Sequence, residues 1–374
     1  MQTLTMQLDA AKTYLSANPW ALQALAGVAK TGFVMSIVML IGGLILSWVE
    51  RKQSAIMQDR IGANRASILG FRAMGLVHNL ADALKGILKE DFIPPKANVF
   101  LHTLAPFLAV GTAVVAFAVL PFGGSVTVLG QVVPLCVAPL PVGIFFVYAL
   151  MAIGVYGVVL AGYVSDNKFS TLGALRASAQ VISYEVATGL TILGALLIYQ
   201  TVDLTQMVAW QTKHVWGVVV QPVGFVLFFV ATIVEMKRIP FDLPEGESEI
   251  IGYNIEYSGM KHMLFMMSEF VEGLLFAWLT VLVFFGGWAV PGLVVGDFGG
   301  AATLLGMPVS YPLAVVLMAA SMTLKIVFFL WLQMLIRWSL PRLRYDQIMH
   351  LGWKIMLPIA LVNLVLTAVA AMFV

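Results

Sequence analysis

The long apolar runs of this sequence constrain its fold more than any other feature. A transmembrane helix needs roughly 20 mostly apolar residues to cross about 30 Å of hydrocarbon. Only 11% of the residues are charged, whereas about 25% is usual for soluble globular chains. We therefore predict a single membrane domain over residues 1–374, an all-α polytopic protein with amphipathic helices and structured polar loops on the cytoplasmic side. Eight transmembrane helices are expected near residues 31–49, 99–121, 141–164, 179–199, 215–235, 263–290, 311–336 and 353–374.

The distribution of charge predicts the orientation of these helices. Of the 21 Lys and Arg residues, 16 lie in the segments 49–98, 164–180, 235–262 and 337–347, and 13 of the 19 Asp and Glu residues lie there too. Of the Lys and Arg residues, the N-terminal 20 residues and the other connections hold only Lys12 and Lys213. Because basic connections are retained in the cytoplasm, we predict that these four segments are cytoplasmic loops. Both termini then lie on the non-cytoplasmic side.

Cysteine content limits the redox chemistry that the chain can carry. The sequence has one cysteine, Cys136. An internal disulfide, a CxxC redox pair and an iron–sulfur cluster held by this chain alone are therefore excluded. If the protein takes part in electron transfer, another protein must supply the electrons.

The segment 76–90 has the spacing of an amphipathic helix. Its apolar residues recur every three or four positions, at Leu76, Val77, Leu80, Ala83, Leu84, Ile87 and Leu88. Polar residues lie on the other face, namely His78, Asn79, Asp82, Lys85 and Lys89. The pattern predicts a helix that lies along the membrane boundary or is packed beneath the bundle. From the pattern alone, its polar face is as well explained by simple contact with water as by a function.

The segment 235–262 is the most polar part of the chain. Pro240, Pro244 and Gly246 exclude a continuous helix there. Such an acidic loop is usually a solvated connector, but Phe241 and Leu243 among the charges favour a structured loop. Its carboxylates include Asp242, Glu245, Glu247, Glu249 and Glu256.

Five ionisable residues fall inside or at the ends of the apolar runs: Glu185, Glu235, Glu269, Glu272 and Lys325. A charge at the centre of a bilayer costs about 2.5–3.5 kcal/mol on insertion scales, so such groups usually face a protein interior and mark ion or proton pathways. The alternative is a set of neutral carboxylates or ion pairs that only hold helices together. Their occurrence on four different runs favours the pathway.

At this point the residues match a known family. The chain resembles the H subunit of the type I proton-pumping NADH:quinone oxidoreductase, which is subunit 1 of the membrane arm in mitochondrial complex I. The resemblance runs from about Glu50 to Lys354 and is carried by Glu50-Arg51-Lys52, Gln58-x-Arg60-x-Gly62-x-Asn64-Arg65, Ala81-Asp82-Ala83-x-Lys85, Gly173-Ala174-Leu175-Arg176-Ala177, Ser183-Tyr184-Glu185-Val186, Arg238-x-Pro240-Phe241-Asp242-Leu243, Glu256-Tyr257-Ser258 and Arg344-Tyr345-Asp346-Gln347.

This resemblance implies a membrane subunit at the junction with the peripheral arm of the complex. It implies that quinone is the substrate, and that iron–sulfur clusters and FMN are held by partner subunits while this chain binds no cofactor. The implied partners are peripheral-arm subunits that hold the terminal cluster, small membrane subunits that lead to antiporter-like subunits, and the lipid bilayer, with no nucleic acid. The implied location is the bacterial plasma membrane.

The resemblance also implies roles for individual residues. A quinone tunnel would be lined by Arg51, Asp82 and Lys85, and the acidic loop would contribute Asp242, Glu245, Glu247, Glu249 and Glu256 to coupling. The embedded charge pathway would comprise Glu185, Glu235, Glu269 and Lys325. No catalytic residue and no metal ligand is expected on this chain.

Two other functions remain open at this stage. Membrane subunits of energy-converting hydrogenases share the eight-span module but reduce no quinone, and bound quinone in the purified complex would separate the two classes. An independent ion transporter could also use embedded carboxylates, but such transporters commonly show two similar halves. We see no such repeat in the sequence.

Overall fold

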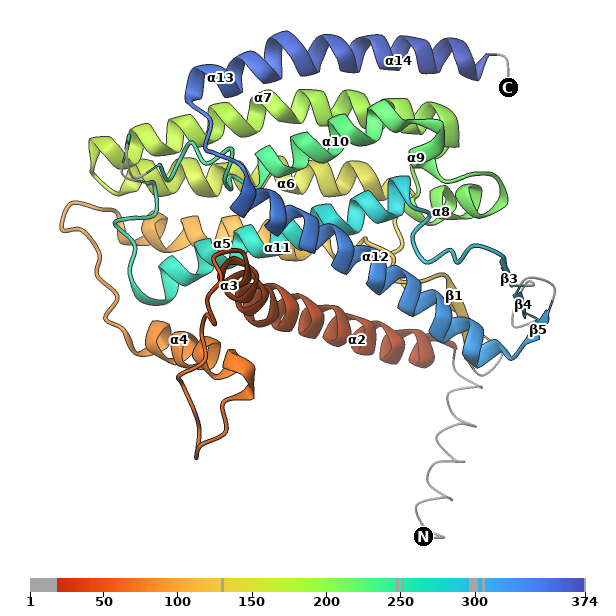
Figure 1. Cartoon of the computed structure of the whole chain (residues 1–374), viewed down its shortest axis with the longest axis horizontal. Helices are drawn as coiled ribbons and strands as arrows, with labels where there is room; N and C mark the ends of the chain where they lie inside the picture. Colours follow the sequence, from red (N-terminus) through yellow and green to blue (C-terminus); the bar gives the residue numbers. More distant parts are fainter. Residues whose placement is uncertain are drawn as a thin grey trace.

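The fold is a bundle of long apolar helices (Figure 1). The computed structural model describes residues 19–128, 131–246, 249–250, 252–295, 302–304 and 307–372. Within this part, seven helices are long and apolar enough to cross a membrane: Gln23–Met57, Val99–Ala116, Gly143–Val164, Lys168–Tyr199, Gly259–Phe284, Leu313–Ser339 and Tyr345–Ala371. The predicted all-α polytopic membrane fold is confirmed.

The fifth predicted span, near residues 215–235, is not one long helix. It consists of α9 (Gly217–Val220) and α10 (Pro222–Glu235). Pro222 opens α10, where a missing N–H group costs nothing because the first helical N–H groups have no partner within the helix. At 1.5 Å per residue, α10 is about 21 Å long, which is shorter than the hydrocarbon layer. The count of eight spans therefore stays a prediction.

Two of the spans contain a stretch of π-helix. The first span is α2 (Pro19–Ile37), the π-helix η1 (Val38–Ile45) and α3 (Leu46–Met57). The last is α13 (Tyr345–His350), the π-helix η4 (Leu351–Met356) and α14 (Leu357–Ala371). The remaining long helices are α5 (Val99–Ala116), α6 (Gly143–Val164), α7 (Lys168–Tyr199), α11 (Gly259–Phe284) and α12 (Tyr311–Ser339).

The predicted amphipathic helix is present as α4 (Leu76–Leu88), which follows a short 3-10 turn, η2 (Ala73–Gly75). Two stretches predicted as cytoplasmic loops are instead largely helical. The segment 164–180 is helical from Lys168 onward, and the segment 337–347 begins in α12 and ends in α13. Charged residues at a helix end reach water without a loop, which is why the charge pattern alone misplaced these boundaries.

The two ends of the bundle differ in structure (Figure 1). One end, here called the strand end, carries the antiparallel hairpin of β1 (Ser125–Val128) and β2 (Gln131–Pro134). It also carries the antiparallel sheet of β3 (Leu293–Val295), β4 (Ala302–Leu304) and β5 (Met307–Val309), together with α8 (Leu204–Lys213). The other end, here called the charged end, carries α4 and the polar segment after α10. The start of α2 and the end of α14 both lie toward the strand end (Figure 1).

Helix α11 lies in the centre of the bundle, and 94% of the residues in its most apolar stretch are buried. It packs against η1, α5, α10 and α12. A Cβ atom at Gly42 would lie 3.1 Å from a Val271 methyl group, so the absent side chain lets η1 approach α11 closely. As a result, the polar side chains of α11 are enclosed by protein.

Candidate functional site

An apolar cavity lies between the first span, α4 and α11. Its volume is about 480 Å³. The cavity is rich in methionine, whose flexible thioether side chain adapts to ligands of irregular shape. Its lining comprises Met39, Gly43, Leu44, Ser47, Arg51, Asn79, Asp82, Ala83, Met260, Met263, Leu264, Met266, Met267 and Phe270.

The polar residues of this cavity come from α3 and α4. Arg51 forms an ion pair with Asp82 at 2.5 Å, and both side chains are about half exposed. The side chain of Asn79 donates a hydrogen bond to the carbonyl of Leu44 at 2.5 Å, which ties α4 to η1. The structure thus brings two of the three predicted tunnel residues together. Lys85 instead lines a separate, more open cavity of about 340 Å³, which Asp82 also borders.

A buried cluster of four charges lies on the other side of Phe270. The Glu50 carboxylate contacts Arg337 at 2.6 Å and Arg238 at 3.7 Å. Arg238 also contacts Glu269 at 3.4 Å, and its guanidinium lies 4.0 Å from the centre of the Phe270 ring. The two arginines repel each other less than their proximity implies, because the Glu50 carboxylate pairs with both. A charge network therefore connects α3, the polar segment after α10, α11 and α12.

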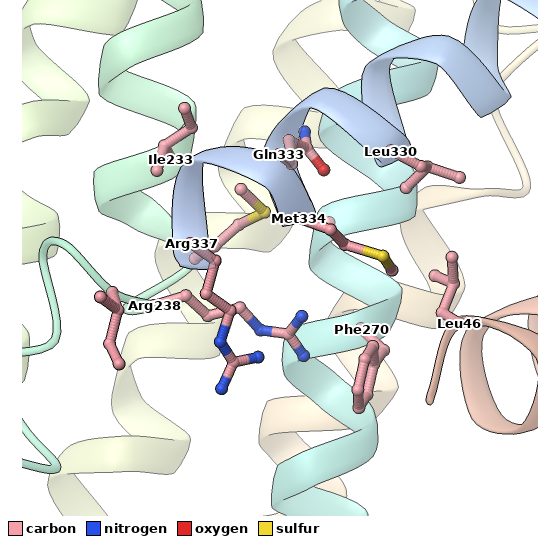
Figure 2. Close-up of a pocket in the computed structure, with 11 residues that line it drawn as sticks. Leu46, Ile233, Arg238, Phe270, Leu330, Gln333, Met334 and Arg337 are labelled. Atoms are coloured by element: carbon pink, nitrogen blue, oxygen red, sulfur yellow. The ribbon is translucent and has the colours of Figure 1, made fainter. Parts of the chain in front are cut away.

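The two guanidinium groups border a cavity the size of a single water molecule, about 20 Å³. Figure 2 shows both groups and the Phe270 ring in the lower part of the view, with Gln333 and Met334 of α12 above them. Arg238 Nη2 and Gln333 Nε2 are buried without a hydrogen-bond partner among the described residues. Phe270 lines both this small cavity and the methionine-rich cavity.

A second group of charges continues along α10 and α11. The ammonium group of Lys237 donates a hydrogen bond to Glu272 at 3.0 Å, and the hydroxyl group of Thr188 donates one to Glu235 at 2.9 Å. Burial opposes the charge on Lys237, but the carboxylates of Glu272, Glu269 and Glu235 raise its pKa above the ordinary value. Glu185 and Glu272 are among the electrostatic neighbours of Glu235. Three of the four predicted pathway residues, Glu185, Glu235 and Glu269, thus lie along one chain of charges.

Lys325, the fourth, lies elsewhere. Its ammonium group donates to the carbonyl oxygens of Phe285, Gly287 and Ala289 at 2.8–3.0 Å, beyond the last turn of α11. The Trp216 ring lies 4.6 Å from the same nitrogen. The structure therefore does not bring Lys325 to the carboxylates.

The acidic loop is folded onto the charged end of the bundle. Asp242 accepts a hydrogen bond from the Glu245 backbone N–H, and Asn254 donates one to the Glu245 carboxylate at 2.6 Å. Glu249 forms an ion pair with Arg176 of α7 at 3.0 Å. Glu256 accepts a hydrogen bond from Asn167 at 2.8 Å. Glu247 lies outside the described residues. The segment is a structured loop, as its apolar residues predict.

Glu245 gives a pH dependence that can be measured. Burial and then the nearby Asp242 carboxylate raise the pKa of Glu245. The folded state of the protein thus favours the protonated form of Glu245. The stabilisation that this gives the folded state is complete below pH 4.5, the ordinary pKa of a glutamate, and is lost as the pH rises through the raised pKa. We expect Glu245→Gln, which keeps an acceptor for Asn254, to be more stable than the wild type by a margin that grows from pH 5 to pH 8. Thermal unfolding midpoints of the purified complex at both pH values would test this. An unchanged margin would contradict it.

Sequence reasoning missed some members of the charge cluster. It gave no role to Glu50 and Arg337, because each stands at the end of an apolar run, where a charged side chain usually faces water. The structure buries the Glu50 carboxylate and partly buries the Arg337 guanidinium, since the ends of α3 and α12 meet beside α11. The motif Glu50-Arg51-Lys52 contained Glu50, but only tertiary contact reveals its partner.

The fold and these cavities define a class: a polytopic membrane protein with an apolar ligand-sized cavity beside a buried chain of ion pairs. The family model for NADH dehydrogenase matches residues 30–368. The chain is 42% identical to the NADH-quinone oxidoreductase H subunit 2 of Rhizobium meliloti, over 91% of this chain and 96% of that protein. It is 40% identical to the NADH-quinone oxidoreductase H subunit 1 of Cytophaga hutchinsonii, over 90% and 95%.

A further relative is the NADH-quinone oxidoreductase H subunit 1 of Geobacter metallireducens, which is 39% identical over 94% of this chain and 98% of that protein. The chain belongs to the NADH dehydrogenase family of NADH-quinone oxidoreductase H subunits. It is therefore a multi-pass membrane subunit of that multi-subunit oxidoreductase complex. The resemblance in its motifs is confirmed.

Proposed function

We propose that this subunit forms the membrane part of the quinone tunnel and couples quinone reduction to proton translocation. The observation that carries the proposal is the position of Phe270. One side of this residue borders the methionine-rich cavity, and the Arg238 guanidinium stacks on its ring. A chemical change in the cavity is thereby one side chain away from the buried charges.

The methionine-rich cavity suits a quinone. Its volume of about 480 Å³ lies within the 300–1,000 Å³ range of small-molecule sites, and its apolar lining matches an isoprenoid tail. Arg51 and Asp82 supply a charged pair at its rim, where a guanidinium can donate to a quinone carbonyl oxygen. Lys85 would act from the neighbouring cavity that Asp82 also borders.

The charge network supplies a route for coupling. Reduction of quinone to quinol takes two electrons, which iron–sulfur clusters of a peripheral-arm subunit would deliver after FMN in that arm, and two protons. A charge change near Phe270 alters the balance at Arg238, which is shared by Glu50 and Glu269. Neighbouring carboxylates titrate as a coupled set, so such a change shifts the protonation of Glu269, Glu235 and Glu185 in turn. The acidic loop, with Asp242, Glu245, Glu247, Glu249 and Glu256, would sense the peripheral arm at the cytoplasmic face.

Filling the cavity tests the quinone site. A Cβ atom at Gly43 would lie 3.8 Å from the end of the Met267 side chain, in ordinary contact, so the backbone tolerates a side chain there. We expect Gly43→Leu to fill part of the cavity and raise the KM for a long-tailed quinone about tenfold, with a smaller effect on kcat. Steady-state quinone reduction by the purified complex would measure this.

The matched control is Gly32→Leu. Gly32 lies in the same helical span, and no atom of the described residues lies within 4 Å of its Cβ position, so the same added volume stays outside the cavity. Its KM should equal that of the wild type, and reduction of a water-soluble acceptor upstream of quinone should be normal in both variants. Equal KM values for Gly43→Leu and the wild type would overturn the proposal.

A further inference from the structure

We propose that Lys325 is a fixed positive charge that keeps protons from crossing this chain between its strand end and its buried carboxylates. The inference rests on the proposed coupling function, because it concerns where the protons handled there can go. It assigns Lys325 a role opposite to that of a proton carrier.

All hydrogen atoms of the Lys325 ammonium group are engaged. Its three donors meet three backbone carbonyl oxygens, those of Phe285, Gly287 and Ala289. Positive backbone φ angles at Gly286 and Gly287, of 67° and 53°, allow the turn that brings these carbonyls to one point. A relay group must release and regain a proton, whereas this arrangement holds every proton of the ammonium in place. These three acceptors favour the ammonium form of Lys325.

The ammonium group of Lys325, which belongs to α12, lies at the C-terminal end of α11. The last carbonyls of a helix carry a partial negative charge and attract cations. A cavity of about 520 Å³ opens at the same end and is bordered by Tyr199, whose hydroxyl group donates to the carbonyl of Val283. Lys325 occupies the site at the end of α11 where a cation would gather.

Between Lys325 and the carboxylates, α11 offers no proton carrier. Glu272 and Phe285 are separated by about 20 Å along the helix. From Leu274 to Phe284 every side chain is at most 8% exposed, and none is ionisable. The two polar groups in this stretch are satisfied, since Trp278 donates to Pro121 and Thr280 donates to Phe276. An apolar segment ending in a fixed cation is a barrier to protons, as in pores that exclude protons with a positive charge.

The test uses the whole oxidoreductase complex reconstituted into vesicles, with passive proton leak measured under an imposed potential and no NADH. Lys325→Gln keeps two N–H donors for the three carbonyls and removes the charge. We expect its leak to rise about tenfold, the scale of one unit charge acting over about 10 Å in a protein-like medium. Lys325→Arg, which keeps the charge, should show the same proton leak as the wild type. With an ionophore present, quinone reduction by Lys325→Gln should match the wild type.

Ser321→Ala is the matched structural control. The Ser321 hydroxyl group donates to the same Ala289 carbonyl at 3.2 Å but carries no charge. If the proton leak increases in proportion to the loss of thermal stability across Lys325→Gln, Lys325→Arg and Ser321→Ala, the role of Lys325 is purely structural and the inference is overturned. A wild-type leak in the Lys325→Gln complex would overturn it as well. Lys325→Met provides a second neutral variant if Lys325→Gln does not assemble. A tight Lys325→Gln complex together with a raised KM in Gly43→Leu would overturn this inference alone and leave the quinone site standing.

Discussion

Glu235→Gln is expected to leave the complex assembled while quinone reduction and proton pumping fall together by about tenfold or more. Glu235 is 4% exposed and accepts a hydrogen bond from Thr188, which the amide oxygen of Gln can also accept. Shape and packing are thus preserved, and only the ability to change protonation is lost. Removing a positioned proton-transfer group commonly costs such factors or more. Rates of NADH-driven quinone reduction and of vesicle acidification in the same preparation measure both effects.

Asp203→Asn controls for the chemistry of this change. Asp203 caps the N-terminus of α8 at the strand end by accepting a hydrogen bond from the Thr205 backbone, and asparagine caps helices equally well. The same carboxylate-to-amide substitution should therefore leave both rates unchanged there. Full coupled activity in Glu235→Gln would remove Glu235 from the proposed pathway.

Arg238→Met is expected to have the largest effect on stability. The Arg238 side chain is 10% exposed and lies between Glu50 and Glu269. Its removal leaves Glu269 as a buried carboxylate without its arginine partner, whereas Glu50 retains Arg337. Breaking a buried ion pair from one side costs about 3–5 kcal/mol because the remaining charge is uncompensated. We expect a lower midpoint of thermal unfolding for the purified complex and a loss of quinone reduction.

The comparison variant is Arg344→Gln. Arg344 contacts Asp346 at 3.9 Å, with both side chains more than 70% exposed. Exposed ion pairs contribute about 0–1 kcal/mol, so this variant should unfold close to the wild-type midpoint. Arg238→Lys, which restores the charge but not the planar guanidinium, should fall between Arg238→Met and the wild type. Equal midpoints for Arg238→Met and Arg344→Gln would show that the cluster does not hold the helices together.

Much of the fold was predictable because membrane insertion is governed by local hydropathy. The apolar runs became helices, and the three-to-four spacing of segment 76–90 became α4. The break before α10 was not predicted, although Pro222 lies within that run, because a proline is also tolerated at the start of an uninterrupted helix. The strands at the strand end were missed as well, since short uncharged connections carry little periodic signal.

The site was predictable in its composition and less so in its geometry. The sequence alone identified Glu185, Glu235 and Glu269 as embedded carboxylates, since an ionisable residue inside an apolar run is visible without a structure. It could not separate them from Lys325, because a hydropathy profile records depth and not which helices are neighbours. The three carbonyls that hold Lys325 come from a turn some 36 to 40 positions away in the chain.

The sequence by itself determined that this protein is a helical membrane protein with few, concentrated charges, because the bilayer accepts only apolar helices whose backbone is internally hydrogen-bonded. Its motifs also identified the family. Only the tertiary structure decided how those charges pair, with Arg238 joining Glu50 to Glu269 beside Phe270 and with Lys325 set apart at the end of α11. The reason is physical: pairing a buried charge requires contact between helices far apart in the chain, and packing sets that contact.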